Sequence, residues 1–426
     1  MLTVIRGGRV IDPGNLDGIM DIFIEDGKIV EIKTDGLADS EHPESKMIDA
    51  SGKIVIPGLI DMHVHLREPG YEYKETIETG CRSAVVGGFT GVCCMPNTNP
   101  VNDCKAVTEY ILTKAREAGT ARVYPVAAIS KGSQGEDLCE YGELKAAGAV
   151  ALSDDGNPVM NSQLMRRALE QAKECQLPVI SHCEDLDLAA GGVMNEGAVA
   201  TGMGLAGIPN ASESIMVLRD IALSELTGAS VHIAHVSTME SVRAIRDAKT
   251  RDVPVTAETA PHYFTLTDAS VKGYNTNMKM NPPLRSSQDR DAVRQGLADG
   301  TIDVIATDHA PHSSIEKSVE FHQAPNGIIG LETALSLGLN LVDEGILTLA
   351  GLIEKMSTNP ARILGLENGL IVGQQADITI IDLERSYRVN ADRFKSLSRN
   401  TPFDGWDMKG KTVLTMVGGK IVYQDE

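Results

Sequence analysis

The sequence predicts an α/β protein: a (β/α)8 barrel of the TIM type with a small β-sandwich-like unit formed by both chain termini. Eight apolar, strand-like runs alternate with helical stretches through the middle of the chain, and short alternating strands occur at both ends. Polar side chains that can bind metals follow most of the eight runs. The expected division is a composite β unit, residues 1–52 and 371–426, and a barrel, residues 53–370.

Short strands separated by turn residues make up the first 52 residues. Asp26-Gly27 between two alternating runs is a strong hairpin signal. Hairpins of this size cannot bury their apolar faces alone. Similar alternating runs occur at residues 376–382 and 412–417, close to the other end of the chain. We therefore expect the two ends to form one β unit into which the middle of the chain is inserted.

The middle of the chain has the rhythm of a parallel barrel. Near-continuous apolar strands alternating with helices are typical of this fold. The expected strands cover residues 53–62, 90–95, 122–129, 149–152, 178–181, 230–235, 253–258 and 303–307. The clearest helices cover residues 74–86, 103–117, 162–175, 212–226 and 238–249. An open doubly wound sheet is the alternative, but no Gly-x-Gly-x-x-Gly turn follows any of these strands.

Composition excludes several classes of function. A formal net charge of −20 and a pI near 4.9 argue against binding to nucleic acid or to an anionic membrane. A small acidic substrate stays possible, because a local cationic pocket can exist on an acidic protein. The seven cysteines follow no framework spacing, and we expect reduced thiols in a cytoplasmic protein, with Cys93-Cys94 packed in the core. No stretch resembles a signal peptide or a membrane span.

Candidate metal ligands stand at the ends of several expected strands. His63 and His65 alternate along the first strand and therefore point to the same side. In a parallel barrel the carboxyl ends of all strands meet at one rim, where other histidines and acids join this pair. The candidate ligands are His63, His65, Asp155, His182, His235 and Asp308. This nitrogen and oxygen set suits Zn²⁺ or a similar divalent ion.

Each candidate ligand has a structural alternative when it is taken alone. Asp155 could cap the next helix, and His182 could be a hydrogen-bonded core histidine; six such residues at corresponding positions favour the metal site. Three other histidines are interpreted differently. His232 has an odd offset from His235, so we expect it to face away from the site. His262 is expected to be a buried loop residue, with a supporting position beside the site as the alternative, and His42 lies in an expected surface loop.

Residues 57–67, PGLIDMHVHLR, resemble the signature of the cyclic amidohydrolases, a group that contains dihydroorotases, dihydropyrimidinases (hydantoinases) and allantoinases. Further segments look like those of dihydroorotases of the long-chain bacterial type. They are residues 66–70 (LREPG), 95–98 (MPNT), 153–156 (SDDG), 280–285 (MNPPLR) and 306–312 (ATDHAPH). The resemblance spans essentially the whole chain, including the split β unit.

The resemblance implies a Zn²⁺ site of one or two ions per chain. Hydantoinases bridge two metals with a carboxylated lysine at the end of the fourth strand. No lysine lies between Lys145 and Lys173 here. The long-chain dihydroorotases have an aspartate at that point, and Asp155 is the matching residue. Its neighbour Asp154 is expected to point away and to cap or hydrogen-bond the loop.

The resemblance also implies reversible hydrolysis of (S)-dihydroorotate to N-carbamoyl-L-aspartate, a step of de novo pyrimidine biosynthesis. Asp308 is the expected proton shuttle as well as a metal ligand. Arg67 offers a planar fork for the substrate carboxylate, and its structural alternative is a surface salt bridge. Asn97 and His312 are expected as further donors, and Asn281 joins the substrate residues by its match to the family.

Two other functions stay open. One is a hydantoinase- or allantoinase-like enzyme, whose substrates lack the carboxylate that Arg67 would bind. The other is an inactive scaffold that pairs with aspartate carbamoyltransferase, a partner that an active enzyme could also have. We expect a homodimer by default. The polar segment 309–327 is expected to form a partly mobile cover over the pocket.

Overall fold

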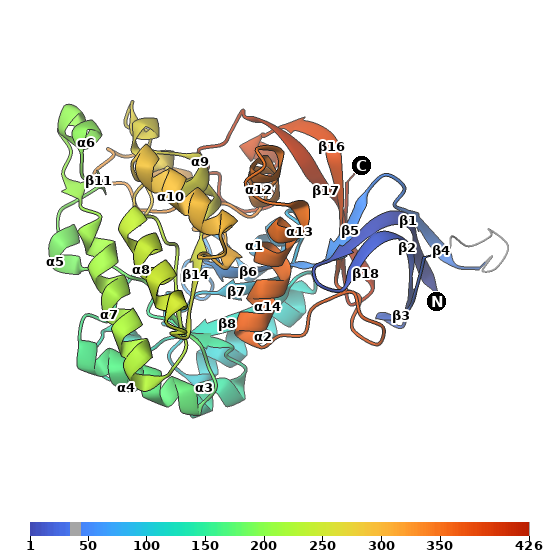
Figure 1. Ribbon diagram of the computed structural model, residues 1–426, viewed down its shortest axis with the longest axis horizontal. Helices are drawn as coiled ribbons and strands as arrows, with labels where there is room; N and C mark the ends of the chain where they lie inside the picture. The colour runs from blue at the N-terminus through green and yellow to red at the C-terminus, as the bar shows by residue number, and fades with distance from the viewer. Residues whose placement is uncertain (35–43, 426) are drawn as a thin grey trace.

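The computed structural model describes residues 1–34 and 44–425. Figure 1 shows two parts: a barrel surrounded by helices, and a sheet on the right that carries both ends of the chain. His42, expected in a surface loop, lies outside the described residues. Within the described ranges, no helix combines the length and the apolar character that a membrane crossing requires.

One eight-stranded sheet joins the two ends of the chain, as the sequence predicted. Its order is β18-β17-β16-β5-β1-β2-β3, and β4 also pairs with β1. Buried apolar residues from both ends, among them Val10, Ile22, Ile378 and Met416, form one cluster in it. The strands are β1 (Thr3–Asp12), β2 (Leu16–Glu25), β3 (Lys28–Lys33), β4 (Lys46–Asp49), β5 (Ile54–Pro57), β16 (Ile378–Arg388), β17 (Asp407–Val417) and β18 (Lys420–Gln424).

The apolar run at residues 53–62, expected as one barrel strand, is two strands in two different sheets. β5 pairs with β1 and β16 in the terminal sheet, and only β6 (Leu59–Val64) belongs to the barrel. The chain passes between the sheets at Gly58, where a Cβ atom would lie 2.0 Å from Thr90 Oγ1. The expectation was wrong because apolar character does not reveal which sheet supplies the hydrogen-bond partners.

The barrel contains eight parallel strands in chain order, as predicted. They are β6, β7 (Phe89–Cys94), β8 (Arg122–Ala127), β9 (Ala151–Leu152), β10 (Val179–Ser181), β13 (Val231–Ile233), β14 (Val255–Thr259) and β15 (Val304–Ile305). The ring is closed by a parallel bridge between Val64 and His309, where His65 N–H donates to the His309 carbonyl at 2.8 Å. Closure therefore brings the end of β6 beside the segment that follows β15.

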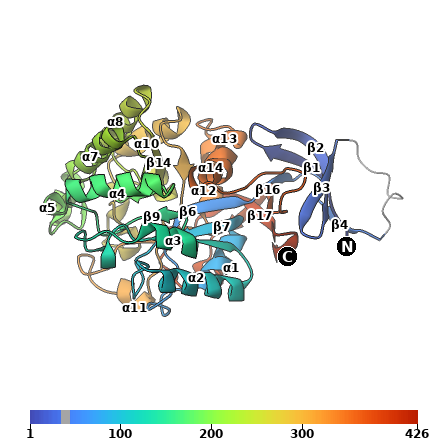
Figure 2. The same cartoon turned by 90° about the horizontal axis from the view of Figure 1, so that it is seen from below.

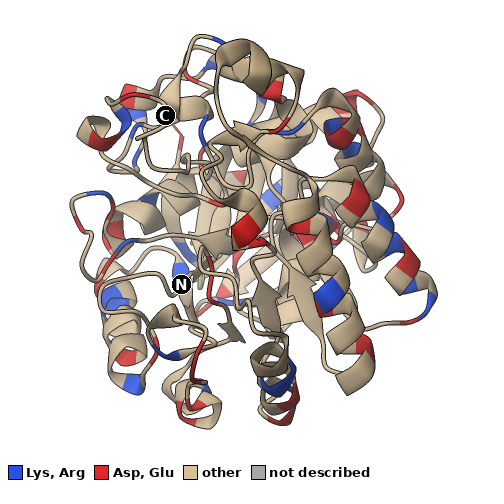
Figure 3. Ribbon diagram, turned by 90° about the vertical axis from the view of Figure 1, so that its left-hand side faces the viewer, with Lys and Arg blue, Asp and Glu red and all other residues tan. Residues whose placement is uncertain are grey.

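Helices surround the barrel. Figure 2 shows that β1 to β4 project at the right-hand end of the molecule, whereas α4, α5, α7 and α8 lie toward the left. Side-chain caps explain where several helices begin: Thr76 for α1, Asn161 for α4 and Thr238 for α8 accept backbone N–H groups of the first turn. The longer helices are α1 (Ile77–Val86), α2 (Lys105–Ala118), α3 (Tyr141–Ala147), α4 (Ser162–Glu174), α7 (Ala211–Thr227), α8 (Met239–Thr250), α10 (Ser287–Ala298) and α12 (Ala334–Asp343). Figure 3 shows acidic and basic positions interspersed along the helices on one side.

The remaining elements are short helices, strands and turns that connect the barrel strands and helices with one another and with the terminal sheet. They are α5 (Leu186–Ala189), β11 (Met194–Asn195), α6 (Ala198–Met203), β12 (Gly207–Ile208), α9 (Pro261–Thr265), α11 (Ser314–Lys317), α13 (Leu349–Ile353), a π-helical turn (Glu354–Thr358) and α14 (Asn359–Leu364). Single 3₁₀ turns are Lys131–Ser133, Asp268–Val271, Thr276–Met278 and Ala391–Arg393.

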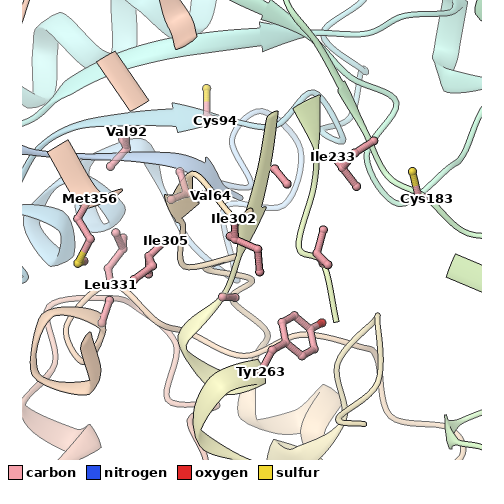
Figure 4. Packing of buried hydrophobic residues seen from close by; sticks show 14 of the residues in the cluster. Val64, Val92, Cys94, Cys183, Ile233, Tyr263, Ile302, Ile305, Leu331 and Met356 are labelled. Carbon is pink, nitrogen blue, oxygen red and sulfur yellow. The ribbon is translucent and has the colours of Figure 1, made fainter. Parts of the chain in front are cut away.

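The main core lies between the strands and the surrounding helices. Figure 4 shows side chains of this core from several strands, among them Val64, Cys94, Ile233 and Ile305. Cys93 and Cys94 are both buried in core clusters, as expected from their place in an apolar strand. All seven cysteines are free thiols in the structure.

Candidate metal centre and substrate pocket

Four histidines meet at the carboxyl ends of three barrel strands. His63 is the second-to-last residue of β6, and His65 directly follows this strand. His182 and His235 follow β10 and β13. All four side chains are buried. The rings of His182 and His235 approach to 2.8 Å between Nδ1 and Nε2. The barrel thus brings together the histidines that the sequence placed on one rim.

Asp155 stands between these four imidazoles. Its Oδ1 lies 3.3 Å from His63 Nε2 and 3.6 Å from both His182 Nδ1 and His235 Nε2. Its Oδ2 lies 3.6 Å from His65 Nε2. Two groups of three possible metal ligands therefore share this carboxylate: one with His63 and His65, the other with His182 and His235.

The donor atoms of this cluster have the properties expected of metal ligands. His63 Nε2 and Asp155 Oδ1 are buried and have no hydrogen-bond partner within the described chain. Such unsatisfied buried atoms are rare, and here they face each other in an imidazole and carboxylate set. Burial alone would raise the pKa of Asp155, but the surrounding imidazoles, His63 foremost, hold it well below the ordinary value of an aspartate. The residues present fit a divalent metal ion.

Asp308 closes the cluster on the side of β15. Its Oδ1 lies 3.1 Å from His65 Nε2 and 3.6 Å from His63 Nε2. Its backbone is left-handed, with φ of 49°, which turns the side chain toward the histidines. Burial would raise the pKa of Asp308, but the hydrogen bond with His65 and the charges of His63 and His235 lower it overall. The carboxylate is thus held ionised beside the cluster.

A further carboxylate, Glu258, supports the cluster from β14. Glu258 Oε1 lies 2.6 Å from His63 Nδ1, and its Oε2 lies 3.2 Å from His232 Nε2. Burial opposes ionisation, but the charges and hydrogen bonds of His63 and His232 lower the pKa of Glu258. This contact fixes the His63 tautomer so that Nε2 faces Asp155. The sequence signal was an acidic residue closing an otherwise apolar strand.

His232 was expected to face away from the site, and this expectation is wrong. Its ring is buried beneath the cluster and bonds Thr256 Oγ1 at 2.8 Å and Glu258. The alternation argument failed because β13 ends at Ile233, and His235 has a left-handed φ of 34°. His232 therefore holds the carboxylate that holds His63.

Replacing Glu258 with glutamine is expected to lower the metal affinity about 10- to 100-fold, as loss of such supporting contacts does elsewhere. The amide oxygen can still accept from the Nδ1–H of His63, but the negative charge of the carboxylate is lost. Titration of the metal-free protein against a chelator of known affinity measures the change. Glu174→Gln on the exposed end of α4 is the matched control. Competition curves of Glu258→Gln that coincide with those of the parent would contradict this role.

Arg67 lies at the mouth of the cluster. Its left-handed φ of 64° follows His65 and Leu66, and its Nε donates to the Pro311 carbonyl at 3.1 Å. Burial lowers the pKa of Arg67, whereas Asp308 and Asp155 act in the opposite direction. In the part of the chain that the structure describes, no carboxylate forms an ion pair with Arg67. The surface salt bridge that was its structural alternative is not formed there.

Two asparagines line the same region. Asn97 Oδ1 lies 2.9 Å from His65 Nδ1, so it orients this histidine and leaves its own amide Nδ2 for another partner. Asn281 Nδ2 donates to Glu184 Oε2 at 3.0 Å, and Glu184 in turn lies 3.4 Å from His182 Nε2. Asn281 Oδ1 is buried and has no partner among the described residues.

His312 is buried near Arg67, but its ring is already engaged. Nε2 donates to the Asn326 carbonyl at 2.7 Å, and Nδ1 lies 3.4 Å from Lys74 Nζ. Burial lowers the pKa of His312 to about 3, so the ring is neutral. In this arrangement its free donor capacity is used on the protein, which differs from the expected role as a substrate donor.

The segment expected to cover the pocket is held by two buried lysines. Lys317 Nζ donates to the carbonyls of Thr276, Lys279 and Pro325, and Lys279 Nζ donates to those of His322 and Ala324. These bonds tie residues 318–327 to the loop that carries Asn281.

Asp154 lies where the sequence predicted, whereas His262 lies in a different kind of element than predicted. Asp154 points away from the cluster, as expected, and accepts the backbone N–H groups of Ile129 and Ser130. His262 lies in helix α9 rather than in a loop; it is buried, and its Nε2 has no partner among the described residues. Burial lowers the pKa of His262 to about 4.

Known proteins match this chain over its whole length. A family model described as dihydro-orotase-like matches residues 52–241. A dihydroorotase of Syntrophus aciditrophicus is 57% identical and one of Desulforapulum autotrophicum is 59% identical, each with 100% of both chains covered. The chain belongs to the dihydroorotase family. Among solved structures, an L-hydantoinase from Arthrobacter aurescens superposes with a TM-score of 0.88 at 27% identity, covering 100% of this chain and 96% of the other.

Membership of the dihydroorotase family agrees with the resemblance found in the motifs. The likeness to the hydantoinase extends to the barrel with a second, β-rich part. A dihydropyrimidinase from Brevibacillus agri, 22% identical with a TM-score of 0.84, shares the fold. Asp155, the acid expected at the end of the fourth barrel strand, belongs to both groups of possible metal ligands.

Proposed function

We propose that the protein catalyses the reversible hydrolysis of (S)-dihydroorotate to N-carbamoyl-L-aspartate. The observation that carries the proposal is the Arg67 guanidinium, which lies at the mouth of the ligand cluster without a carboxylate partner among the described residues. A planar guanidinium binds a carboxylate through two parallel hydrogen bonds. Hydantoin, dihydropyrimidines and allantoin lack the ring carboxylate that would use it.

The neighbouring asparagines suit the rest of this substrate. Asn281 Oδ1, buried without a partner among the described residues, can accept a hydrogen bond from a ring N–H. Asn97 Nδ2 can donate to the carboxylate or to a ring carbonyl, since its Oδ1 is used by His65. His312 is placed in the proposed pocket because it lies close enough to Arg67 for that charge to lower its pKa, although both ring nitrogens have protein partners.

We further propose that the metal is Zn²⁺, with two ions per chain, held by His63, His65, Asp155, His182, His235 and Asp308. The sharing of Asp155 by two groups of histidines supports the count of two. A bound zinc ion supplies a water of lowered pKa and polarises the ring carbonyl. Imidazoles oriented by Glu258 and Asn97 are suited to hold it.

Asp308 is the proposed proton carrier. Its Oδ1 lies beside His65 Nε2 and is held ionised, so it would take the proton from a water that attacks the ring carbonyl. The protonated carboxyl then donates to the ring nitrogen as the amide bond breaks. In ring closure the same oxygen removes a proton from the carbamoyl nitrogen. The intact His63 and His65 pair and Asp308 argue against an inactive scaffold.

A substrate comparison tests the proposal. The zinc-loaded protein is expected to open dihydroorotate and to close N-carbamoyl-L-aspartate, with a much lower kcat/KM on hydantoin, as chromatography of both products would measure. Removal of the metal by a chelator should abolish both directions, and added Zn²⁺ should restore them, because no side chain replaces the activated water. A preference for hydantoin, or full turnover by the metal-free protein, would contradict the proposal.

The assembly and location are proposed on a coarser basis. A homodimer is supported by the frequency of two-fold dimers and by the outer face of α7, where Ile215, Leu218 and Leu226 are 47%, 55% and 63% exposed. A cytoplasmic location is supported by the seven free cysteines. An association with aspartate carbamoyltransferase rests on the resemblance alone.

A further inference from the structure

A cavity of about 880 Å³ lies outside the metal cluster, between helix α12 and the strands of the terminal sheet. Its wall includes Leu335 and Ser336 of α12, residues 385–388 of β16, residues 389–390 and 393–395 of the following segment, and Lys411 of β17. Figure 1 shows α12 beside β16 and β17, at the junction of the two parts of the molecule. A volume of this size is typical of small-molecule sites.

Three cationic side chains line this cavity without an ion-pair partner among the described residues. Arg388, Arg393 and Lys395 line it, and none of them forms an ion pair with a described residue. Lys411 and Arg385 also line it, but both contact Asp425, at 2.5 and 3.3 Å. Because the protein as a whole is strongly acidic, three cations around one hollow with no described carboxylate paired to them are a local exception.

One other acid, Glu332, lines the cavity, and its charge is reduced. Glu332 Oε1 accepts the Ser83 hydroxyl at 2.9 Å and the backbone N–H groups of Lys395 and Ser396 at 2.6 and 3.2 Å. Burial raises the pKa of Glu332 to about 7. Around neutral pH this carboxyl is therefore partly protonated, and the cavity keeps a net positive charge.

The cavity also has aromatic walls. Tyr387, Phe394 and Tyr423 line it, and all three rings are partly buried. Tyr387 is held in place by Ser336, whose hydroxyl lies 2.8 Å from the phenol oxygen, and by the ammonium of Lys411, 5.7 Å from the ring centre. Fixed rings beside free cations can receive a ligand with a flat part and an anionic part.

We propose that this cavity binds a nucleoside phosphate, with the phosphate on Arg388, Arg393 and Lys395 and the base against the aromatic walls. A cavity of about 880 Å³ is much larger than inorganic phosphate needs, so the cations alone do not account for it. Guanidinium groups bind phosphate oxygens in pairs, and aromatic faces stack on any base. The proposal concerns a site separate from the metal cluster and does not depend on the proposed reaction.

The segment after the cavity leads to the substrate pocket. Leu397 N–H donates to Glu75 Oε1 at 2.9 Å. Asn400 Nδ2 then donates to the carbonyls of Ala310 and Gly327 at 3.0 and 3.1 Å, and its Oδ1 accepts His312 N–H at 3.1 Å. Residues 395–400 thus connect the cation-lined wall to both ends of the segment that follows β15. A ligand bound to Lys395 therefore contacts the start of residues 395–400, whose far end holds the segment after β15 in place.

Calorimetric titration of the metal-loaded, full-length protein with adenosine 5′-monophosphate tests the proposal. We expect one saturable site per chain, with adenosine and inorganic phosphate each binding at least about tenfold more weakly, because each lacks one half of the contacts. The double variant Arg388→Ala/Arg393→Ala should weaken binding at least about tenfold. Amide exchange should slow at residues 389–400 when the nucleotide is added.

Two controls and one alternative cavity variant make the test specific to this site. Lys409→Ala removes an exposed cation of β17 outside the cavity and should bind the nucleotide as the parent does. Arg67→Met should also retain binding; loss of binding there would assign the nucleotide to the catalytic pocket and overturn the proposal. Lys395→Ala offers a single exposed substitution if the double variant unfolds. Absence of binding, unchanged affinity in the cavity variants, or phosphate binding as tightly as the nucleotide would each overturn it.

Discussion

Asp308→Asn is expected to lower kcat for both ring opening and ring closure by about 10²- to 10⁴-fold, the usual contribution of a positioned proton carrier. The amide keeps the shape of the side chain near His65 but cannot take up a proton. Asparagine also tolerates the left-handed φ of 49° at this position. Metal content should stay at or near the parent level, since His63, His65 and Asp155 remain. Steady-state kinetics together with metal analysis measure both effects.

Asp252→Asn is the matched control for this substitution. This substitution makes the same chemical change in a similar backbone conformation, because Asp252 has a φ of 56° and lies on an exposed turn before β14. Its kinetics should equal those of the parent. If Asp308→Asn retained its metal and its parental kcat, the proposed role of Asp308 in proton transfer would be wrong.

Arg67→Met is expected to reduce kcat/KM for dihydroorotate by at least about a hundredfold. Two charge-assisted hydrogen bonds to the substrate carboxylate, each contributing about 1.5–3 kcal/mol, are lost together. Methionine carries a Cβ at the same left-handed φ of 64°, so the backbone strain does not change. Slow turnover of hydantoin, which has no carboxylate, should be unaffected. Assays of both substrates measure the selectivity directly.

Two further variants make this test specific. Arg67→Lys keeps the charge but loses the planar fork, so its kcat/KM should fall between those of the parent and Arg67→Met. Arg82→Met removes an exposed arginine of α1 that pairs with Glu78, and it should leave both activities unchanged. Equal loss on dihydroorotate and hydantoin in Arg67→Met would show that the residue supports the pocket rather than recognising a carboxylate.

Much of the fold was predictable because its signals are local. The eight barrel strands are near-continuous apolar runs separated by helices, and turn residues mark the hairpins at the termini. The split at Gly58 was not predictable in the same way. β5 and the beginning of β6 form one apolar run, and the two strands belong to different sheets because β5 pairs with β1 and β16 whereas β6 pairs with β7.

The candidate ligands were predictable for a geometric reason. Residues two apart on a strand share a face, which pairs His63 with His65. Parallel strands end at one rim, which adds Asp155, His182, His235 and Asp308. The structure brings all of them together. Their proposed roles await the kinetic and metal measurements above.

From the sequence alone came the barrel, the joining of the two termini, and the strand-end cluster beside Arg67. These features depend on periodicity and on chain order. Only the tertiary structure decided that Glu258 and His232 hold His63, that the His312 ring is occupied, and that Asn400, between β16 and β17, contacts Ala310 and His312. Those contacts join residues far apart in the chain, and their partners are set by strand register and loop packing rather than by local pattern.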